Sequence, residues 1–195
     1  RTSRPGGASC IDDLVNLVQL FVLGLVCVDS LAGVAPDAAI GYRAAIGLAG
    51  QGIVLDQFNN DVRDQSILLS TLDASDDVDF ILSPEMNASK QFVANTIPLS
   101  GPSRRIIRLS PDGQGGYINE TIAETGPVAG PNPDPVFTAF VNSTAIAPDG
   151  SLAFSARRAD DSVWQVTRRD APRAPLARIA EGGQMGIVTS NLANF

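Results

Sequence analysis

The stretch Ile146-Ala-Pro-Asp-Gly-Ser-Leu-Ala-Phe154 joins a Pro-acid turn to a short apolar segment that ends in an aromatic residue. Two earlier stretches follow the same plan, since Val34-Ala-Pro-Asp leads to Tyr42 and Leu82-Ser-Pro-Glu leads to Phe92. Proline presets the backbone of the turn, and the apolar segment has the length and composition of a strand. A pattern that recurs along a chain in this way predicts a tandem array of β units.

The similarity extends beyond the turns. Residues 105–109 and 162–166 are short alternating runs, and residues 119–126 and 176–183 share an Ile-Ala-Glu core followed by glycine. Short alternating runs between turn residues are typical of antiparallel strands with one buried face. We therefore predict a mainly β fold of antiparallel, blade-like repeats, arranged as an incomplete propeller or as a sandwich.

The expected organisation has two parts. Residues 1–33 form a flexible arm followed by an apolar helix, and residues 34–195 form the β-repeat body. The body divides into units at about 34–76, 77–130 and 131–195.

The apolar run 14–28 predicts the helix of the first part, at about 11–28, with apolar side chains around most of its circumference. Burial against protein is the favoured interpretation, and membrane contact or a signal remnant are the alternatives. The abundant valines are also compatible with a buried pair of strands in place of the helix. If the helix docks onto a partner, Leu17, Phe21 and Leu25 are the expected interface residues.

The third unit resembles a family of secreted bacterial tandem repeats named for an NxxGxxAF motif. The matching residues are Gly150, Ala153 and Phe154, whereas Ala147 replaces the leading asparagine. The second unit carries two extra residues between Pro84 and Phe92. The resemblance implies propeller-like blades of about four strands, a secreted protein and no assigned activity.

Three units are too few to close a propeller, which needs at least about four blades. Open sheet edges and faces must then be covered, because they pair readily with other chains. The N-terminal helix or a neighbouring subunit could provide this cover.

Composition excludes several kinds of chemistry. The chain has no histidine, so it cannot contain a Ser-His-Asp triad or a histidine-ligated metal. Its two cysteines cannot build a structural zinc site alone, and a net charge of −7 disfavours nucleic acid as a partner. We expect no enzyme activity, no catalytic residues and no cofactor other than a possible calcium ion. Glu124 and Glu181 occupy matching repeat positions and are assigned a structural role.

One loop is rich in carboxylates. Calcium binds oxygen ligands at flexible spacing, so this loop is the candidate calcium site, with a solvated acidic loop as the alternative. The candidate ligands are Asp73, Asp76, Asp77 and Asp79.

Three Asn-x-Ser/Thr sequences stand in or beside predicted loops. If the source is a eukaryote, the candidate glycosylation sites are Asn87, Asn119 and Asn142. The glycine-rich residues 47–52 lack the strand-turn-helix context of a phosphate-binding loop and are predicted to form a turn.

Together these features favour a non-enzymatic structural or assembly subunit outside the cytoplasm, secreted or at the cell surface. It would present its β-repeat body and dock through the apolar N-terminal segment into a complex, a membrane-associated assembly or a homo-polymer. The alternative is a carbohydrate- or ligand-binding propeller-type module, with calcium assisting.

Overall fold

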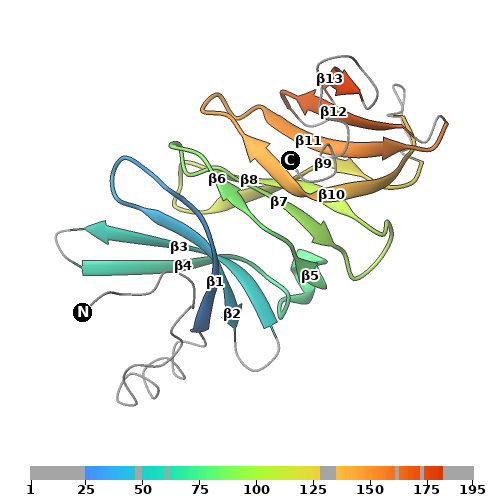
Figure 1. Ribbon diagram of the computed structural model, residues 1–195. Helices are drawn as coiled ribbons and strands as arrows, with labels where there is room; N and C mark the ends of the chain where they lie inside the picture. Colours follow the sequence, from blue (N-terminus) through green and yellow to red (C-terminus); the bar gives the residue numbers. More distant parts are fainter. Residues whose placement is uncertain are drawn as a thin grey trace, which may run out of the picture.

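A computed structural model describes residues 25–46, 50–59, 62–127, 135–160, 163–171 and 174–181 of the chain. These residues form three antiparallel sheets that follow one another along the sequence (Figure 1). The prediction of a mainly β fold is confirmed. Among the described residues, the helical structure is a single short 3-10 turn at Ala74–Asp76.

Each sheet is a meander in which consecutive strands pair. Sheet 1 runs β1(Leu25–Val34), β2(Ile40–Ile46), β3(Gly50–Asn59) and β4(Val62–Ser70). Sheet 2 has a first strand in two short pieces, β5(Phe80–Ile81) and β6(Glu85–Met86), which both pair with β7(Phe92–Ile97), and then β8(Arg105–Pro111) and β9(Tyr117–Glu124). Sheet 3 runs β10(Phe137–Ile146), β11(Leu152–Arg158), β12(Trp164–Arg169) and β13(Ala177–Glu181).

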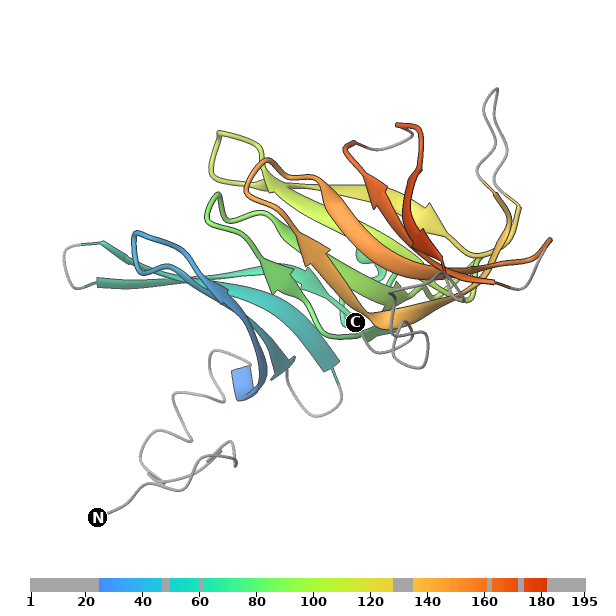
Figure 2. The same cartoon turned by 45° about the horizontal axis from the view of Figure 1, so that its top comes forward.

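The sheets pack face against face in chain order, as the turned view also shows (Figure 2). One apolar cluster lies between sheets 1 and 2, where Ile53 and Leu69 meet Phe92. A second lies between sheets 2 and 3, where Ile106 meets Phe154. Burial of such side chains contributes about 1.5–3 kcal/mol each, so stacking of the sheets supplies the core.

Alternation along the second strand of each sheet decides which residues face which neighbour. We call the face toward the preceding sheet the N-side face and the opposite one the C-side face. In sheet 1, which has no preceding sheet among the described residues, the N-side face is the one turned away from sheet 2. The N-side faces carry Phe92 and Ala94 in sheet 2, and Leu152, Phe154 and Ala156 in sheet 3. In sheet 1 the same face carries Ile40, Tyr42 and Ala44.

The same turn connects the first and second strands of every sheet. In sheet 1 the Ala38 amide donates to the Ala35 carbonyl at 3.0 Å, and in sheet 3 the Gly150 amide donates to the Ala147 carbonyl at 2.9 Å. The fourth residue of each turn has positive φ: 63° at Ala38, 60° at Lys90 and 82° at Gly150. We refer to residues 35–39, 87–91 and 147–151 as turns 1, 2 and 3.

Turn 2 corrects the sequence alignment. Its Lys90 amide donates to the Asn87 carbonyl at 3.0 Å, so the turn starts at Asn87 and not at the Pro84-Glu85 pair. Glu85 instead lies in β6. The second unit therefore has no insertion at this point, and Asn87 takes the place that Ala147 has in turn 3. Phe92 consequently aligns with Leu152, two positions before Phe154 in its strand.

Glycine allows close approach of sheets 1 and 2. A Cβ atom on Gly41 would lie 2.5 Å from the Phe92 ring and 2.7 Å from the Met86 sulfur.

Gly50 and Gly52 lie inside β3, so the predicted turn at 47–52 is wrong for these residues. A Cβ on Gly52 would meet the end of the Ile46 side chain and lie 3.0 Å from the Leu69 carbonyl oxygen, so the space beside this strand residue is narrow.

The N-terminal helix is corrected where the structure describes it. Residues 25–28 lie in β1, in which Leu25 pairs with Ile46 and Val28 with Ala44. β-branched residues fit a pleated sheet, and the hydrogen-bonded ladder with β2 outweighs the helical pattern here. Residues 11–24 of the predicted helix lie outside the described residues. Within the described ranges no helix is long and apolar enough to cross a membrane.

Candidate functional site

A surface hollow of about 550 Å³ lies where sheets 2 and 3 meet. Three segments form it: the loop before β8, the end of β9 and the start of β10. The lining residues are Gly101, Pro102, Ser103, Glu124, Thr125, Gly126, Pro127, Val136, Phe137 and Thr138. Its wall therefore combines apolar surface with hydroxyl groups and one carboxylate.

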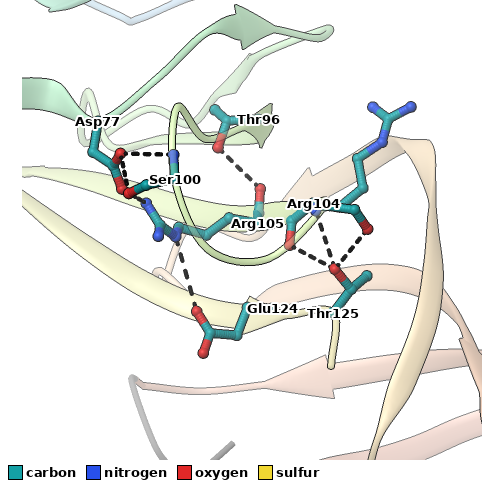
Figure 3. A network of polar contacts seen from close by, with 8 residues as sticks. Asp77, Thr96, Ser100, Arg104, Arg105, Glu124 and Thr125 are labelled. Atoms are coloured by element: carbon teal, nitrogen blue, oxygen red, sulfur yellow. Dashed lines mark hydrogen bonds and ion pairs between the residues drawn. The ribbon is translucent and has the colours of Figure 1, made fainter. Parts of the chain in front are cut away.

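An ion-pair chain supports one wall of this hollow (Figure 3). The Arg105 guanidinium lies 3.1 Å from a carboxylate oxygen of Asp77 and 3.9 Å from one of Glu124. Asp77 also accepts hydrogen bonds from the Ser100 amide and hydroxyl, at 3.2 and 3.0 Å. The Ser100 hydroxyl and then Arg105 lower the pKa of Asp77 below its ordinary value.

Thr125 fixes the loop on the other side of the network. Its hydroxyl accepts from the Arg104 amide at 3.1 Å and lies 3.0 Å from the Ser103 hydroxyl. Its amide donates to the Arg104 carbonyl at 3.1 Å. The Arg104 side chain extends away from this network (Figure 3). The loop is thus held by main-chain and hydroxyl contacts together, and the Ser103 and Thr125 hydroxyls at the rim of the hollow bond to each other.

The arrangement suits binding of a small polar ligand. Hydroxyls, main-chain groups and the Glu124 carboxylate can donate to or accept from a hydroxyl-rich molecule, and Phe137 supplies an apolar base. Arg105 stands between Asp77 and Glu124, so these two carboxylates are paired with a cation and not with each other.

Three of the four carboxylates proposed as calcium ligands have separate protein partners, and the fourth, Asp79, is exposed. Asp73 caps the 3-10 turn by accepting from Ser75, and Asp76 accepts from the Ser70 amide at 2.7 Å. Asp77 belongs to the network above. In the part of the chain that the structure describes, no three such groups gather as a metal site. The calcium site remains a prediction.

The three sequons have different surroundings. Asn87 is 7% exposed, and its side-chain amide donates to the Ala147 carbonyl and to Gln91, both at 2.8 Å. A glycan on that nitrogen would have to replace these bonds. Asn119 in β9 and Asn142 in β10 are exposed. Glycosylation of any of them remains a prediction.

The predicted interface residues fall mostly outside the described chain. Leu17 and Phe21 precede residue 25, and Leu25 begins β1. Of the matching glutamates, Glu124 lines the hollow and Glu181 ends β13. Glu124 is linked through Arg105 to Asp77 of the acidic loop.

Sequence reasoning missed the polar residues that join the sheets. Arg43 donates to the Ile81 carbonyl at 2.6 Å, and Asn95 donates to the Val141 carbonyl at 2.8 Å. Both donors stand on C-side faces, five residues after the positive-φ residue of their turn. Ser155 takes this place in sheet 3. Correct alignment of the three turns in the sequence would have shown that Arg43, Asn95 and Ser155 are equivalent polar positions.

A second polar cluster lies on the N-side face of sheet 1. Asp56 is 6% exposed and accepts from the Tyr42 hydroxyl, from Arg63 at 2.6 Å and from Gln65 at 3.0 Å. Burial and the neighbouring Asp56 raise the pKa of Tyr42. The cluster ties β2, β3 and β4 together at one end of the sheet.

Comparison with family models, with curated proteins and with solved structures finds no match to this chain.

Proposed function

We propose that this protein is a non-enzymatic assembly module that works outside the cytoplasm. Its three sheets would act as blades of a propeller-type repeat body whose end faces bind protein. The function is carried by contact between folded surfaces and involves no chemical step.

One comparison carries this proposal. Val34, Met86 and Ile146 each stand directly before the turn of their sheet and pair with the first residue of the second strand. Met86 is 9% exposed and packs into the core between sheets 1 and 2, and Ile146 packs against the core between sheets 2 and 3. Val34 is 60% exposed. The position that sheet 2 buries and sheet 3 partly buries is thus exposed in sheet 1.

The exposed apolar surface of sheet 1 extends beyond Val34. Leu31, Tyr42, Val54 and Ile67 form one cross-strand row on the N-side face. Leu31 is 62% and Ile67 is 48% exposed, whereas Tyr42 and Val54 between them are buried, at 3% and 0%. Exposed apolar side chains that gather on one face are typical of sites that bind protein.

Light scattering during size-exclusion chromatography over a range of concentrations tests the proposal. We expect a mass above the 20.4 kDa of one chain, rising toward a defined assembly. A mass of one chain at every concentration would contradict it. The N-terminal contribution is tested with a chain that begins at Leu25, which leaves all three sheets complete. If the apolar segment docks, this truncation weakens assembly and leaves the β circular dichroism unchanged.

Binding of a small hydroxyl-rich ligand is a second candidate, favoured by the hollow between sheets 2 and 3. Titration calorimetry with a panel of simple sugars, with and without millimolar calcium, tests it. Thr138→Trp, which fills the hollow from its rim, should abolish any heat of binding. Thr121→Trp, on the same pair of sheets but outside the hollow, is the matched control. Heat that persists in Thr138→Trp would place the ligand elsewhere.

A further inference from the structure

Sheet 3 has a second, smaller hollow beside its own turn. Its volume is about 290 Å³, and Ala145, Ala153, Ser151 and Arg168 are among the residues that line it. Ala153 and Arg168 pair across β11 and β12 on the C-side face. The hollow is therefore on the face that, in sheets 1 and 2, receives the next sheet.

The equivalent place on sheet 2 is filled by turn 3. Val93 and Arg108 pair there as Ala153 and Arg168 do in sheet 3. Arg108 donates to the Gly150 carbonyl of turn 3 at 2.9 Å, and Asn87 donates to the Ala147 carbonyl at 2.8 Å. Turn 3 is thus seated on this part of sheet 2.

The equivalent place on sheet 1 is filled by Met86. A Cβ on Gly33 would meet the Met86 main chain at 2.7 Å, and one on Gly41 would meet the Met86 sulfur. Small residues at these two positions make room for the apolar residue that precedes the next turn. Sheet 3 has Ala145 and Ala153 at the same two positions, which again leaves room for such a residue.

We propose that a second copy of this chain fills the hollow on sheet 3 with its turn 1 and with Val34. The contact rests on the proposed assembly function and names its partner. It is head to tail, because the N-side face of sheet 1 meets the C-side face of sheet 3. Two copies that make this contact reciprocally bring six sheets together, within the range of about four to eight blades found in closed propellers.

The sizes of the side chains on the two sides agree with this partner. In the contact inside the chain, Gln91 of sheet 2 stands opposite Gly150, where an added Cβ would lie 2.8 Å from the Gln91 side chain. On sheet 3 the smaller Ser151 replaces Gln91, and on turn 1 Ala38 replaces Gly150. Within the chain Asp37 of the turn pairs with Lys90, and Arg168 of the hollow pairs with Asp149 and Asp170, so the contact would form beside these ion pairs.

Two substitutions block the two sides separately. Ala153→Arg fills the hollow, and Val34→Arg removes the apolar residue that enters it; both positions are at least partly exposed. Leu99→Arg, at a residue that is 54% exposed and belongs to neither face, is the control. We expect the unchanged chain and the control to form pairs of twice 20.4 kDa, and each blocked variant to dissociate with a dissociation constant raised at least about tenfold.

Mixing the two blocked variants separates the proposal from simple unfolding. The Ala153→Arg chain keeps its Val34, and the Val34→Arg chain keeps its hollow, so the mixture should form pairs through one intact contact. Recovery of pairs in the mixture supports head-to-tail docking and shows that both variants are folded.

The other outcomes overturn the proposal. If Val34→Arg dissociates the pair and Ala153→Arg does not, sheet 1 binds itself; if neither substitution has an effect, another surface holds the copies. In both cases the assembly function stands and the head-to-tail contact fails. A mass that grows beyond two copies excludes the closed pair. An unchanged chain that remains single removes both the contact and the assembly function.

Discussion

The ammonium group of Lys90 lies 2.5 Å from a carboxylate oxygen of Asp37, so an ion pair joins turn 2 to turn 1. The same lysine contacts the Gln57 side chain at 3.1 Å. The hydrogen bond from Lys90 is the largest cause of a lowered pKa at Asp37. The pair is one of several polar contacts that hold consecutive sheets together.

Lys90→Met should alter how stability depends on pH. Because the folded pKa of Asp37 is lowered, the pair stabilises the protein above the ordinary value of 3.8 and loses this effect as pH falls through the folded pKa. We expect the unchanged chain to melt at a higher temperature than Lys90→Met at neutral pH, with a difference that vanishes in strong acid. Thermal unfolding followed by circular dichroism measures it. A constant difference at all pH values would show that the ion pair is not its cause.

The positive-φ residues of turns 1 and 3 form a matched test of backbone strain. Gly150→Ala should destabilise the protein by about 1–2 kcal/mol, because alanine is strained at φ 82° and its methyl group would crowd Gln91. Ala38→Gly relieves backbone strain at φ 63° but also raises the conformational entropy of the unfolded chain. We expect relief of strain to dominate, so that the free energy of unfolding rises by up to about 1 kcal/mol. Urea unfolding gives both values. Opposite signs support the equivalence of the turns, and equal losses contradict it.

Gly41→Ala tests the close approach of sheets 1 and 2. Its methyl group would overlap the Phe92 ring, and overpacking of this kind costs about 1–3 kcal/mol. Phe92→Leu, which removes the far end of the ring, should cost less in the Gly41→Ala background than alone. A double-mutant cycle of unfolding free energies measures this coupling. Additive losses would mean that the two residues do not meet.

Asn95→Ala tests the hydrogen bond between sheets 2 and 3. Asn95 is fully buried, and loss of its bond to the Val141 carbonyl should cost about 1–3 kcal/mol. Ser155→Ala is the matched control at the equivalent place in sheet 3; Ser155 is also buried, at 2% exposed, but no described sheet lies against its face, so its replacement should cost less than that of Asn95. Similar losses of unfolding free energy in the two variants would contradict a specific contribution from the hydrogen bond between sheets 2 and 3.

Much of the fold was predictable from local pattern. Residues 105–109, 119–124 and 152–154 alternate or carry β-formers, and all lie in strands; the Pro111-Asp-Gly113 turn joins β8 to β9 with Gly113 at φ 77°. The failures have particular causes. Turn 2 has no proline or glycine, because Asn87 caps it through its side chain, so the more obvious Pro84-Glu85 pair misled the alignment.

The candidate site was less predictable. The acidic loop stood out by composition, but the structure divides its carboxylates among Ser75, the Ser70 amide and Arg105. The hollow between sheets 2 and 3 uses residues from three segments, none of which carries a motif. Its shape follows from how two sheets meet, which local pattern does not contain.

The sequence by itself determined the class of fold and the exclusion of histidine-dependent chemistry, because these depend on composition and on alternation over a few residues. Tertiary structure alone decided that Leu25–Val28 join a strand, which face of each sheet meets its neighbour, and that Val34 is exposed where Met86 is buried and Ile146 partly buried. The physical reason is that such outcomes depend on partners brought together from distant parts of the chain. A valine before a turn has the same local pattern whether or not another sheet lies against it.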